Sequence, residues 1–187
     1  KPVDLHEGID STLLILHHRL KADPSRPDIN IVKHYGSLPK VNCLAGELNQ
    51  VFMNILSNAI DALRSQEQSL PAVQHPDPTI TIKTMMLEAI AAQPTQICIT
   101  ISDNSPVILP EYQTQLFDPF FTTKPIGEGT GLGLAISYKI VTEHHNGSLR
   151  CQSVPGQQTV FEVCIPVTPP GKAVSDRPSS VELSSSR

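Results

Sequence analysis

The feature that most constrains the fold is the stretch GELNQVFMNILSNAIDAL, residues 46 to 63. On a helix that advances 100° per residue, its apolar side chains cover the wider part of the circumference, so a helix here must be mostly buried. We predict a helix from about Gly46 to Gln66. The narrower polar arc carries Glu47, Gln50, Asn54, Ser57, Asn58 and Asp61.

The composition of this polar arc is unusual for a solvated helix surface. Lysine and glutamate would normally serve there, whereas asparagine is a poorer helix former. Asn54 and Asn58, one turn apart, therefore indicate a functional role. Amide oxygens and carboxylates are hard ligands that suit Mg²⁺, which takes the rest of its shell from water and phosphates. A polar stripe that merely packs on a loop is the alternative.

The rest of the chain alternates between helical and strand patterns. A first helix is expected from Leu5 to about Lys21, with Asp4 as its cap. Short helical stretches are expected at 110–117 and from about Gly131 to His145. Because the strands mostly follow one another as hairpins, the pattern favours an α+β sandwich over a doubly wound parallel sheet. Strands are predicted at residues 29–35, 79–84, 95–103, 148–154 and 158–167.

Composition excludes several classes of function. The formal net charge is −4 and no Lys/Arg cluster occurs, which argues against nucleic-acid binding. No apolar run approaches membrane-spanning length. The cysteines stand far apart without a C-x-x-C pair, so we expect isolated, buried, reduced thiols in a cytosolic protein rather than disulfides or a metal site. The cysteines are Cys43, Cys98, Cys151 and Cys164.

The domain organisation expected is one folded domain and a tail. Residues 1–167 carry the structured pattern, and the Ser/Pro-rich residues 168–187 are expected to be disordered. The abrupt opening KPVDLHEGID predicts a fragment of a longer protein.

A glycine run, GEGTGLG at residues 127 to 133, directly precedes the last predicted helix. Glycines allow the backbone to approach a ligand closely, and a helix N-terminus favours negative charge, so we expect a phosphate as the ligand. The run lacks the Walker pattern G-x-x-x-x-G-K-[ST], and no strand precedes it as a Rossmann fingerprint requires. By itself it is equally typical of a structural turn.

Four stretches in order, NQVFMNILSNAIDAL, ISDN, LFDPFFTTK and GTGLGLAIS, resemble the N, G1, F and G2 boxes of sensor histidine kinases. The ATP-binding domain of those kinases has the Bergerat fold shared with gyrase, Hsp90 and MutL. The resemblance spans roughly Val3 to Val167. It implies a two-layer α/β sandwich with a mixed, mainly antiparallel sheet and helices on one face.

The resemblance also implies residue roles. Asn58 matches the asparagine that coordinates Mg²⁺, Asn54 contacts the phosphate side, and Asp61 on the same face supports the metal shell. Asp103 matches the aspartate that recognises the adenine amino group. Lys124 would approach the phosphates from a lid spanning about 118–129, and it joins Asn54 and Asn58 as a catalytic candidate. The backbone of Gly129, Thr130, Gly131, Leu132 and Gly133 would line the triphosphate, with the side chains of Leu132 and Leu134 packed beneath it.

The function implied is that of the catalytic ATP-binding domain of a two-component histidine kinase. Its cofactors would be ATP and Mg²⁺, and it would deliver the γ-phosphate to a histidine on an upstream dimerisation domain. A response regulator would then receive the phosphate. The expected parent is a homodimer with this domain in the cytoplasm, and the isolated domain is expected to be a monomer. The phosphoacceptor signature H-E-x-x-N/R-x-P is absent from the chain, and His6-Glu7 only superficially resembles it.

Two alternatives stay open. The G1 box reads DNSPVILP, with Ser105 and Val107 at the usual glycine positions. The first alternative is therefore a degenerate ATP-binding module with little or no kinase activity. A gyrase-like ATPase needs a glutamate base one turn before Asn58, where this chain has Asn54, an amide that cannot abstract a proton. Glu47 lies two turns further back on the same face.

Overall fold

The computed structural model describes residues 2–24, 26–69, 77–90, 94–106, 108–125, 127, 129–153 and 158–167. A five-stranded sheet has the order β2-β4-β5-β7-β6. The pair β2–β4 is parallel and the other pairs are antiparallel. Its strands are β2 (Asn30–Tyr35), β4 (Thr79–Leu87), β5 (Gln96–Asp103), β6 (Ser148–Ser153) and β7 (Thr159–Pro166). A separate small ladder joins β1 (Pro2–Val3) to β3 (Val41–Asn42).

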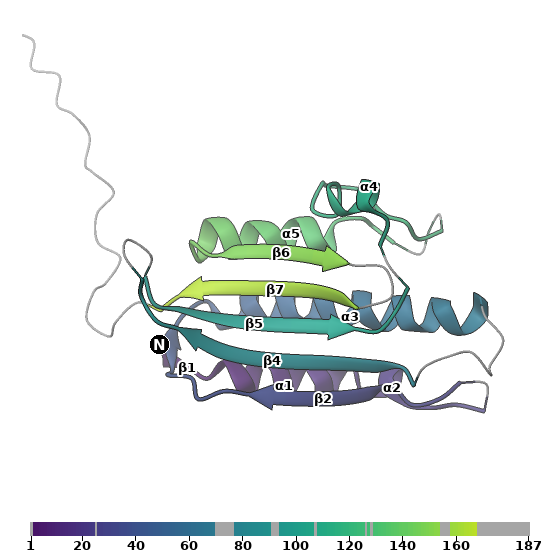
Figure 1. The fold of residues 1–187 in the computed structure, drawn as a ribbon, viewed down its shortest axis with the longest axis horizontal. Coiled ribbons are helices and arrows are strands. Elements are labelled where there is room, and N and C mark those ends of the chain that lie inside the picture. The colour runs from purple at the N-terminus through teal and green to yellow at the C-terminus, as the bar shows by residue number, and fades with distance from the viewer. Residues whose placement is uncertain are drawn as a thin grey trace, which may run out of the picture.

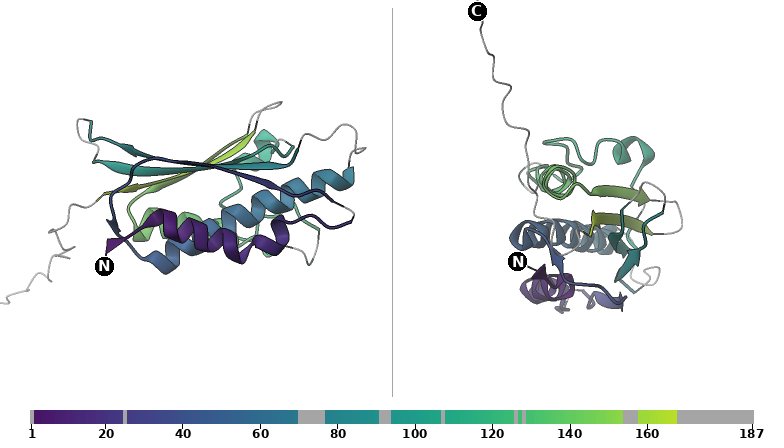
Figure 2. Two further views of the ribbon diagram at one scale, coloured as in Figure 1. Left: turned by 90° about the horizontal axis from the view of Figure 1, so that it is seen from below. Right: turned by 90° about the vertical axis from the view of Figure 1, so that its left-hand side faces the viewer.

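The main helices lie on one face of this sheet, which gives two layers (Figures 1 and 2). The central helix α3 runs along the middle strands, between α1 and α5. The expected α+β sandwich with a mixed, mainly antiparallel sheet and helices on one face is confirmed. The helices are α1 (Leu5–Ile15), α2 (His17–Leu20), α3 (Ala45–Ser69), α4 (Pro110–Gln113) and α5 (Gly133–Lys139), and α5 continues as the π-helical turn η2 (Ile140–His144).

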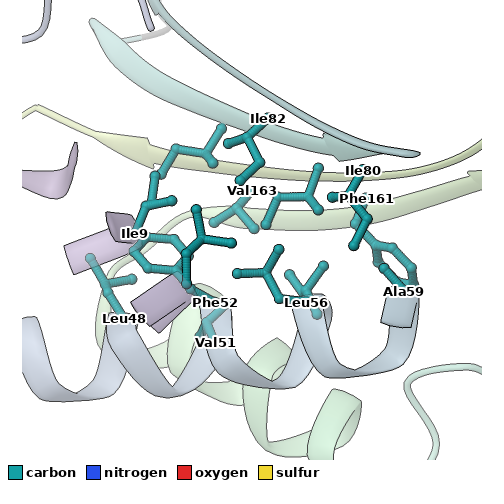
Figure 3. Close-up of a cluster of buried hydrophobic side chains, with 14 of the residues drawn as sticks. Ile9, Leu48, Val51, Phe52, Leu56, Ala59, Ile80, Ile82, Phe161 and Val163 are labelled. Carbon is teal, nitrogen blue, oxygen red and sulfur yellow. The ribbon is translucent and has the colours of Figure 1, made fainter. Parts of the chain in front are cut away.

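The core lies between α3 and the sheet (Figure 3). Alternate residues of β5, namely Ile97, Ile99 and Ile101, are fully buried beneath the helices. From α3, Phe52 and Leu56 point toward the strands and are fully buried. Burial of this apolar face at roughly 25 cal/mol per Å² is the main force that holds the two layers together, and it leaves the polar arc of α3 for other contacts.

The helix boundaries differ from the sequence prediction in detail. The first helix is capped as expected, since the Asp4 side chain accepts from the backbone N–H of His6 at 2.9 Å, but it divides into α1 and α2 at Leu16. The last helix begins at Gly133, two residues later than expected, and ends through η2 at His144, just before the predicted Asn146-Gly147, where Asn146 has a φ of 51°. The predicted tail 168–187 lies outside the described residues. Among the described residues, no helix is long and apolar enough to cross a membrane.

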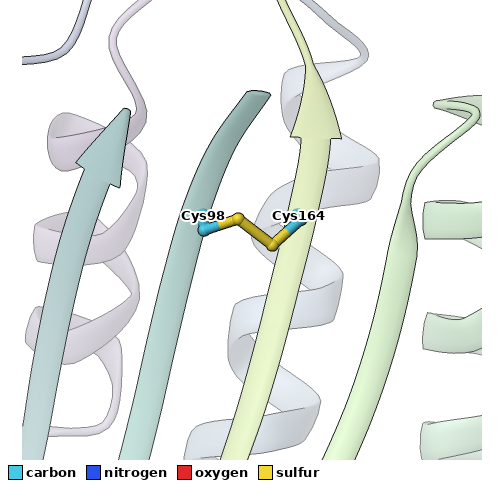
Figure 4. The surroundings of a disulfide bond; sticks show 2 residues. All are labelled: Cys98 and Cys164. Atoms are coloured by element: carbon cyan, nitrogen blue, oxygen red, sulfur yellow. A yellow bond between two sulfur atoms is a disulfide. The ribbon is translucent and has the colours of Figure 1, made fainter. Parts of the chain in front are cut away.

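The prediction of isolated reduced cysteines is wrong for two of the four residues. Cys98 in β5 and Cys164 in β7 stand directly opposite each other, with Cα atoms 4.1 Å apart, and form a disulfide. Figure 4 shows the bond on the face of the sheet that the helices do not cover. The pairing depends on strand register across 66 residues, which sequence spacing does not reveal. Cys43 and Cys151 are free thiols and only half-buried.

Candidate functional site

Asn54, on the polar arc of α3, contacts the first turn of α5. Its Nδ2 donates to the carbonyl of Gly133 at 2.9 Å and to the hydroxyl of Ser137 at 3.0 Å. A Cβ on Gly133 would lie 3.4 Å from the Asn54 amide carbon, an ordinary van der Waals contact, so this contact does not itself require glycine. No described residue donates to the Asn54 Oδ1. The amide therefore fixes the glycine-bordered start of α5 and keeps an oxygen available.

Asn58 and Asp61 follow Asn54 on the same helical face. Asn58 is half-buried and forms no hydrogen bond with any described residue. The side chain of Asp61 is 34% exposed and forms two ion pairs, with Lys124 through Oδ2 and with Arg19 through Oδ1. Lys124 is expected to approach the phosphates from the lid, and in the structure its ammonium group contacts Asp61 of α3. No sequence pattern indicated a role for Arg19.

The position of Arg19, in α2, is set by Arg64 of the central helix α3. The guanidinium of Arg64 donates to the carbonyls of Arg19 at 3.1 Å, Leu20 at 3.4 Å and Pro27 at 2.8 Å. These carbonyls lie at the end of α2 and in the loop that follows, so Arg64 fastens that segment to α3. The side chain of Arg19 consequently extends over Asp61, one turn before Arg64.

The loop that carries Lys124 is closed at its base by Gly131. Gly131 has a φ of 66°, and its carbonyl accepts from the N–H of Phe120 at 2.9 Å. A Cβ on Gly131 would lie 2.4 Å from the Phe120 carbonyl carbon, so only glycine fits. Phe120 itself has a φ of 67°.

Gly129 also serves the packing of this loop. A Cβ there would lie 2.7 Å from the Thr122 hydroxyl and close to the Lys124 side chain. Thr130, next along the chain, accepts from the N–H of Leu132 at 3.3 Å, and Leu134 packs against the core. Part of the glycine pattern is thus explained by contacts within the loop.

Asp103 is the last residue of β5 and is 3% exposed. Its carboxylate accepts the backbone N–H of Ser105 at 3.1 Å. Burial raises the pKa of Asp103 above its ordinary value, and the hydrogen bond from Ser105 only partly offsets this. The residue lies where β5 ends, on the same side of the molecule as α4 and the C-terminal half of α3 (Figure 1).

The altered G1 box has an ordinary backbone at Ser105. Among the described non-glycine residues, only Phe120 and Asn146 have positive φ. Ser105 therefore does not need the conformation that would require glycine. Val107, the other substituted position, lies outside the described residues.

The loop after Asp103 is tied to the final hairpin by polar residues that belong to none of the sequence motifs. Ser153 accepts the N–H of Ile108 and shares a hydrogen bond with the hydroxyl of Thr159, both at 2.9 Å. Thr159 is paired with Asp103 in the sheet. Gln113 donates to the carbonyls of Ile108 at 2.8 Å and Ser153 at 2.9 Å. Only the register of β5, β6 and β7 reveals this network.

Cys151 lies near the same buried carboxylate. Burial raises the pKa of its thiol to about 12, and the charge of Asp103 contributes in the same direction. The thiol is thus neutral at physiological pH and packs as a small apolar group.

The site therefore combines a buried carboxylate, two amides on one helix face, a lid lysine and a glycine-bordered helix start. The family model described as histidine kinase-, DNA gyrase B- and HSP90-like ATPase matches residues 44–169. The chain belongs to this family. Within it, the chain is a catalytic ATP-binding domain of the histidine kinase type, as its relatives indicate.

Curated relatives in this family are sensor kinases. The chain is 36% identical over 134 residues to the signal transduction histidine-protein kinase AtoS of Escherichia coli (strain K12), covering 72% of this chain and 19% of AtoS. It is 34% identical over 170 residues to the sensory histidine kinase/phosphatase NtrB of Rhizobium meliloti (strain 1021), covering 89% of this chain and 41% of NtrB. The chain thus spans less than half the length of either relative.

Solved structures share the fold. The catalytic domain of histidine kinase ThkA superposes with a TM-score of 0.70 at 24% identity, over 90% of this chain and 98% of that domain. The mycobacterial sensor histidine kinase MprB gives 0.66 at 24% identity, over 90% and 98%. ThkA has also been solved in complex with a response regulator protein, TrrA.

Proposed function

We propose that this domain binds Mg·ATP between α3 and the start of α5 and delivers its γ-phosphate to a histidine on a separate dimerisation domain. The observation that carries the proposal is the contact of Asn54 with Gly133, which sets the amide arc of α3 against the glycine-bordered start of α5. Asn58 stands one turn further along, and its amide forms no hydrogen bond with any of the residues that the structure describes.

The donor set at this place fits magnesium. The Oδ1 of Asn58 is a hard neutral oxygen without a partner among the described residues, which suits an ion that completes its shell with water and phosphates. Asn58 would hold the metal and Asn54 would face the phosphates. When bound, Mg²⁺ supplies neutralisation of phosphate charge.

The base and the phosphates would occupy the two ends of the site. Asp103 would accept the exocyclic amine of adenine, and a base without that donor would leave a buried carboxylate unpaired, so ATP is favoured over GTP. Lys124 would contact the phosphates from the lid. The backbone of Gly129, Thr130, Gly131, Leu132 and Gly133 would line the triphosphate, and Leu134 would pack beneath it.

Phosphate transfer is favoured over ATP hydrolysis by water. A water-activating enzyme needs a carboxylate base beside the metal, and the position one turn before Asn58 holds an amide. Glu47 does not substitute, because its carboxylate is bound to His144 Nδ1 at 2.7 Å, two turns away from Asn54. The domain would therefore act by placement of the nucleotide and charge neutralisation.

The ordinary backbone of Ser105 supports an active domain over a degenerate one, because this substitution imposes no strain beside Asp103. The partners proposed are the dimerisation domain, which makes the parent a homodimer, and a response regulator. We propose no nucleic-acid partner. The cytoplasmic location and the monomeric state of this domain alone stay predictions.

The proposal is tested by incubating the full protein that carries this chain with γ-labelled Mg·ATP. The expected product is protein-bound phosphate that is labile in acid and stable in alkali, as a phosphoramidate of histidine is. Asn58→Ala should abolish it. If the wild-type protein instead releases free phosphate and forms no protein-bound phosphate, it is a hydrolytic ATPase.

A further inference from the structure

Asp61 holds two cations that come from different parts of the chain. Its Oδ2 pairs with Lys124 of the lid and its Oδ1 pairs with Arg19 of α2. All three side chains are between 33% and 42% exposed, so solvent and ligands reach them. We call this group of three, Arg19, Asp61 and Lys124, the carboxylate clasp.

Arg19 is presented to α3 by the fold rather than by a mobile end of the chain. Arg64 binds the carbonyls of Arg19 and Leu20, which fixes the backbone from which the Arg19 side chain extends. The backbone position from which the Arg19 side chain extends therefore does not depend on Asp61. A planar guanidinium also suits a bidentate contact with a phosphate better than a lysine does.

The charges of the clasp do not balance. One carboxylate faces two cations, so the group carries a net charge of about +1 beside Asn58, where a metal-bound phosphate is proposed. A terminal phosphate carries more negative charge than a carboxylate and offers more acceptor oxygens. It therefore competes with Asp61 for both cations, while Asp61 repels the phosphate.

We propose that Arg19 is a second phosphate-binding cation of the nucleotide site, and that Asp61 holds Arg19 and Lys124 together until a terminal phosphate displaces it. This rests on the proposed nucleotide site. It gives Asp61 a role opposite to the support of the metal shell that the family resemblance implies. The clasp favours ATP over ADP, because only a γ-phosphate reaches both released cations.

The test measures ATP and ADP affinity, with Mg²⁺ present, by calorimetry on the whole chain. Asp61→Asn should tighten ATP binding roughly three- to tenfold and ADP binding less, because a repelling charge is removed. Arg19→Gln should weaken ATP binding by a similar factor with ADP nearly unchanged. Lys21→Gln is the matched control, since Lys21 lies two residues away and pairs with Asp28 at 3.7 Å instead.

A second measurement needs no nucleotide. Asp61→Asn should speed amide hydrogen exchange in residues 118–125, because Lys124 loses its anchor, whereas Lys21→Gln should leave exchange as in the wild type. Weaker Mg·ATP binding by Asp61→Asn would assign Asp61 to the metal shell and overturn the clasp. An unchanged ATP-to-ADP ratio in Arg19→Gln would overturn the role of Arg19. Failure of the wild type to bind either nucleotide would overturn the proposed function as well.

Discussion

At the scale of single residues, Asp103 is placed under opposing demands. The fold buries its carboxylate at the end of β5, which disfavours the charged form, while the proposed recognition of adenine needs that form. The raised pKa means that the folded protein holds a proton over a range of pH in which the unfolded chain has released it. Across that range, stability due to this group therefore falls as the pH rises.

The raised pKa of Asp103 also makes ATP binding depend on pH, but here the affinity falls as the pH falls. As the pH falls through the raised pKa, Asp103 becomes protonated, loses its negative charge and becomes a weaker acceptor for the adenine amine. We expect the affinity measured by calorimetry to decline at a higher pH than the ordinary value of 3.8 would give. Asp103→Asn should lose ATP binding at neutral pH while its melting temperature stays equal or rises, and a large loss of stability would contradict this.

Gly131 gives a second prediction at this scale. Gly131→Ala places a Cβ 2.4 Å from the Phe120 carbonyl carbon, in a backbone conformation that disfavours side chains. The base of the lid must shift, and we expect ATP affinity to fall roughly tenfold, about 1.4 kcal/mol. Gly46→Ala is the control, because nothing lies within 4 Å of its added Cβ and its ATP affinity should be unchanged.

At the scale of secondary-structure elements, the joint between α3 and α5 depends on Asn54. Asn54→Ala removes the hydrogen bonds to Gly133 and Ser137, so we expect the free energy of unfolding to fall by about 1 to 2 kcal/mol in urea titrations. Gln50→Ala, one turn earlier and exposed on the same helix, should cost less than about 0.5 kcal/mol. Equal effects of the two changes would show that this joint does not stabilise the domain.

Helices and strands could be predicted from the sequence where their own residue pattern determines them. The apolar face of 46–63 indicated a buried helix because its periodicity does not depend on its neighbours. The short helix expected at 110–117 is present as α4 but ends at Gln113, and the split of the first helix at Leu16 had no comparable signal. The family resemblance implied one site for Asn54 and Lys124, which stays a prediction. Arg19 had no such signal, because its position depends on the contacts of Arg64.

At the scale of the whole molecule, strand register determines which distant residues face each other across the sheet, and sequence spacing does not reveal this. Register places Thr159 opposite Asp103 and Cys98 opposite Cys164. Both pairs join segments that are far apart in the chain, so neither is visible as a motif. The hairpin pattern predicted an α+β sandwich, and the family resemblance implied a mixed, mainly antiparallel sheet. Neither predicted the cysteine bond.

The Cys98–Cys164 disulfide predicts a redox dependence of stability. It closes a loop of 66 residues, for which the chain-entropy model gives about 4 kcal/mol. Reduction should lower the melting temperature, and Cys98→Ser should lower it equally and make it insensitive to reductant. The denatured, unreduced chain should contain two titratable thiols, those of Cys43 and Cys151. Four thiols in that assay would contradict the bond.

The central claim is that a metal-bound nucleotide lies between the amides of α3 and the glycine-bordered start of α5. The most direct measurement is calorimetric titration of the chain with Mg·ATP, with Asn58→Ala beside the wild type. We expect one molecule bound per chain, with the magnesium-dependent part of the affinity lost in the variant. Equal Mg·ATP affinity in both proteins would contradict the account.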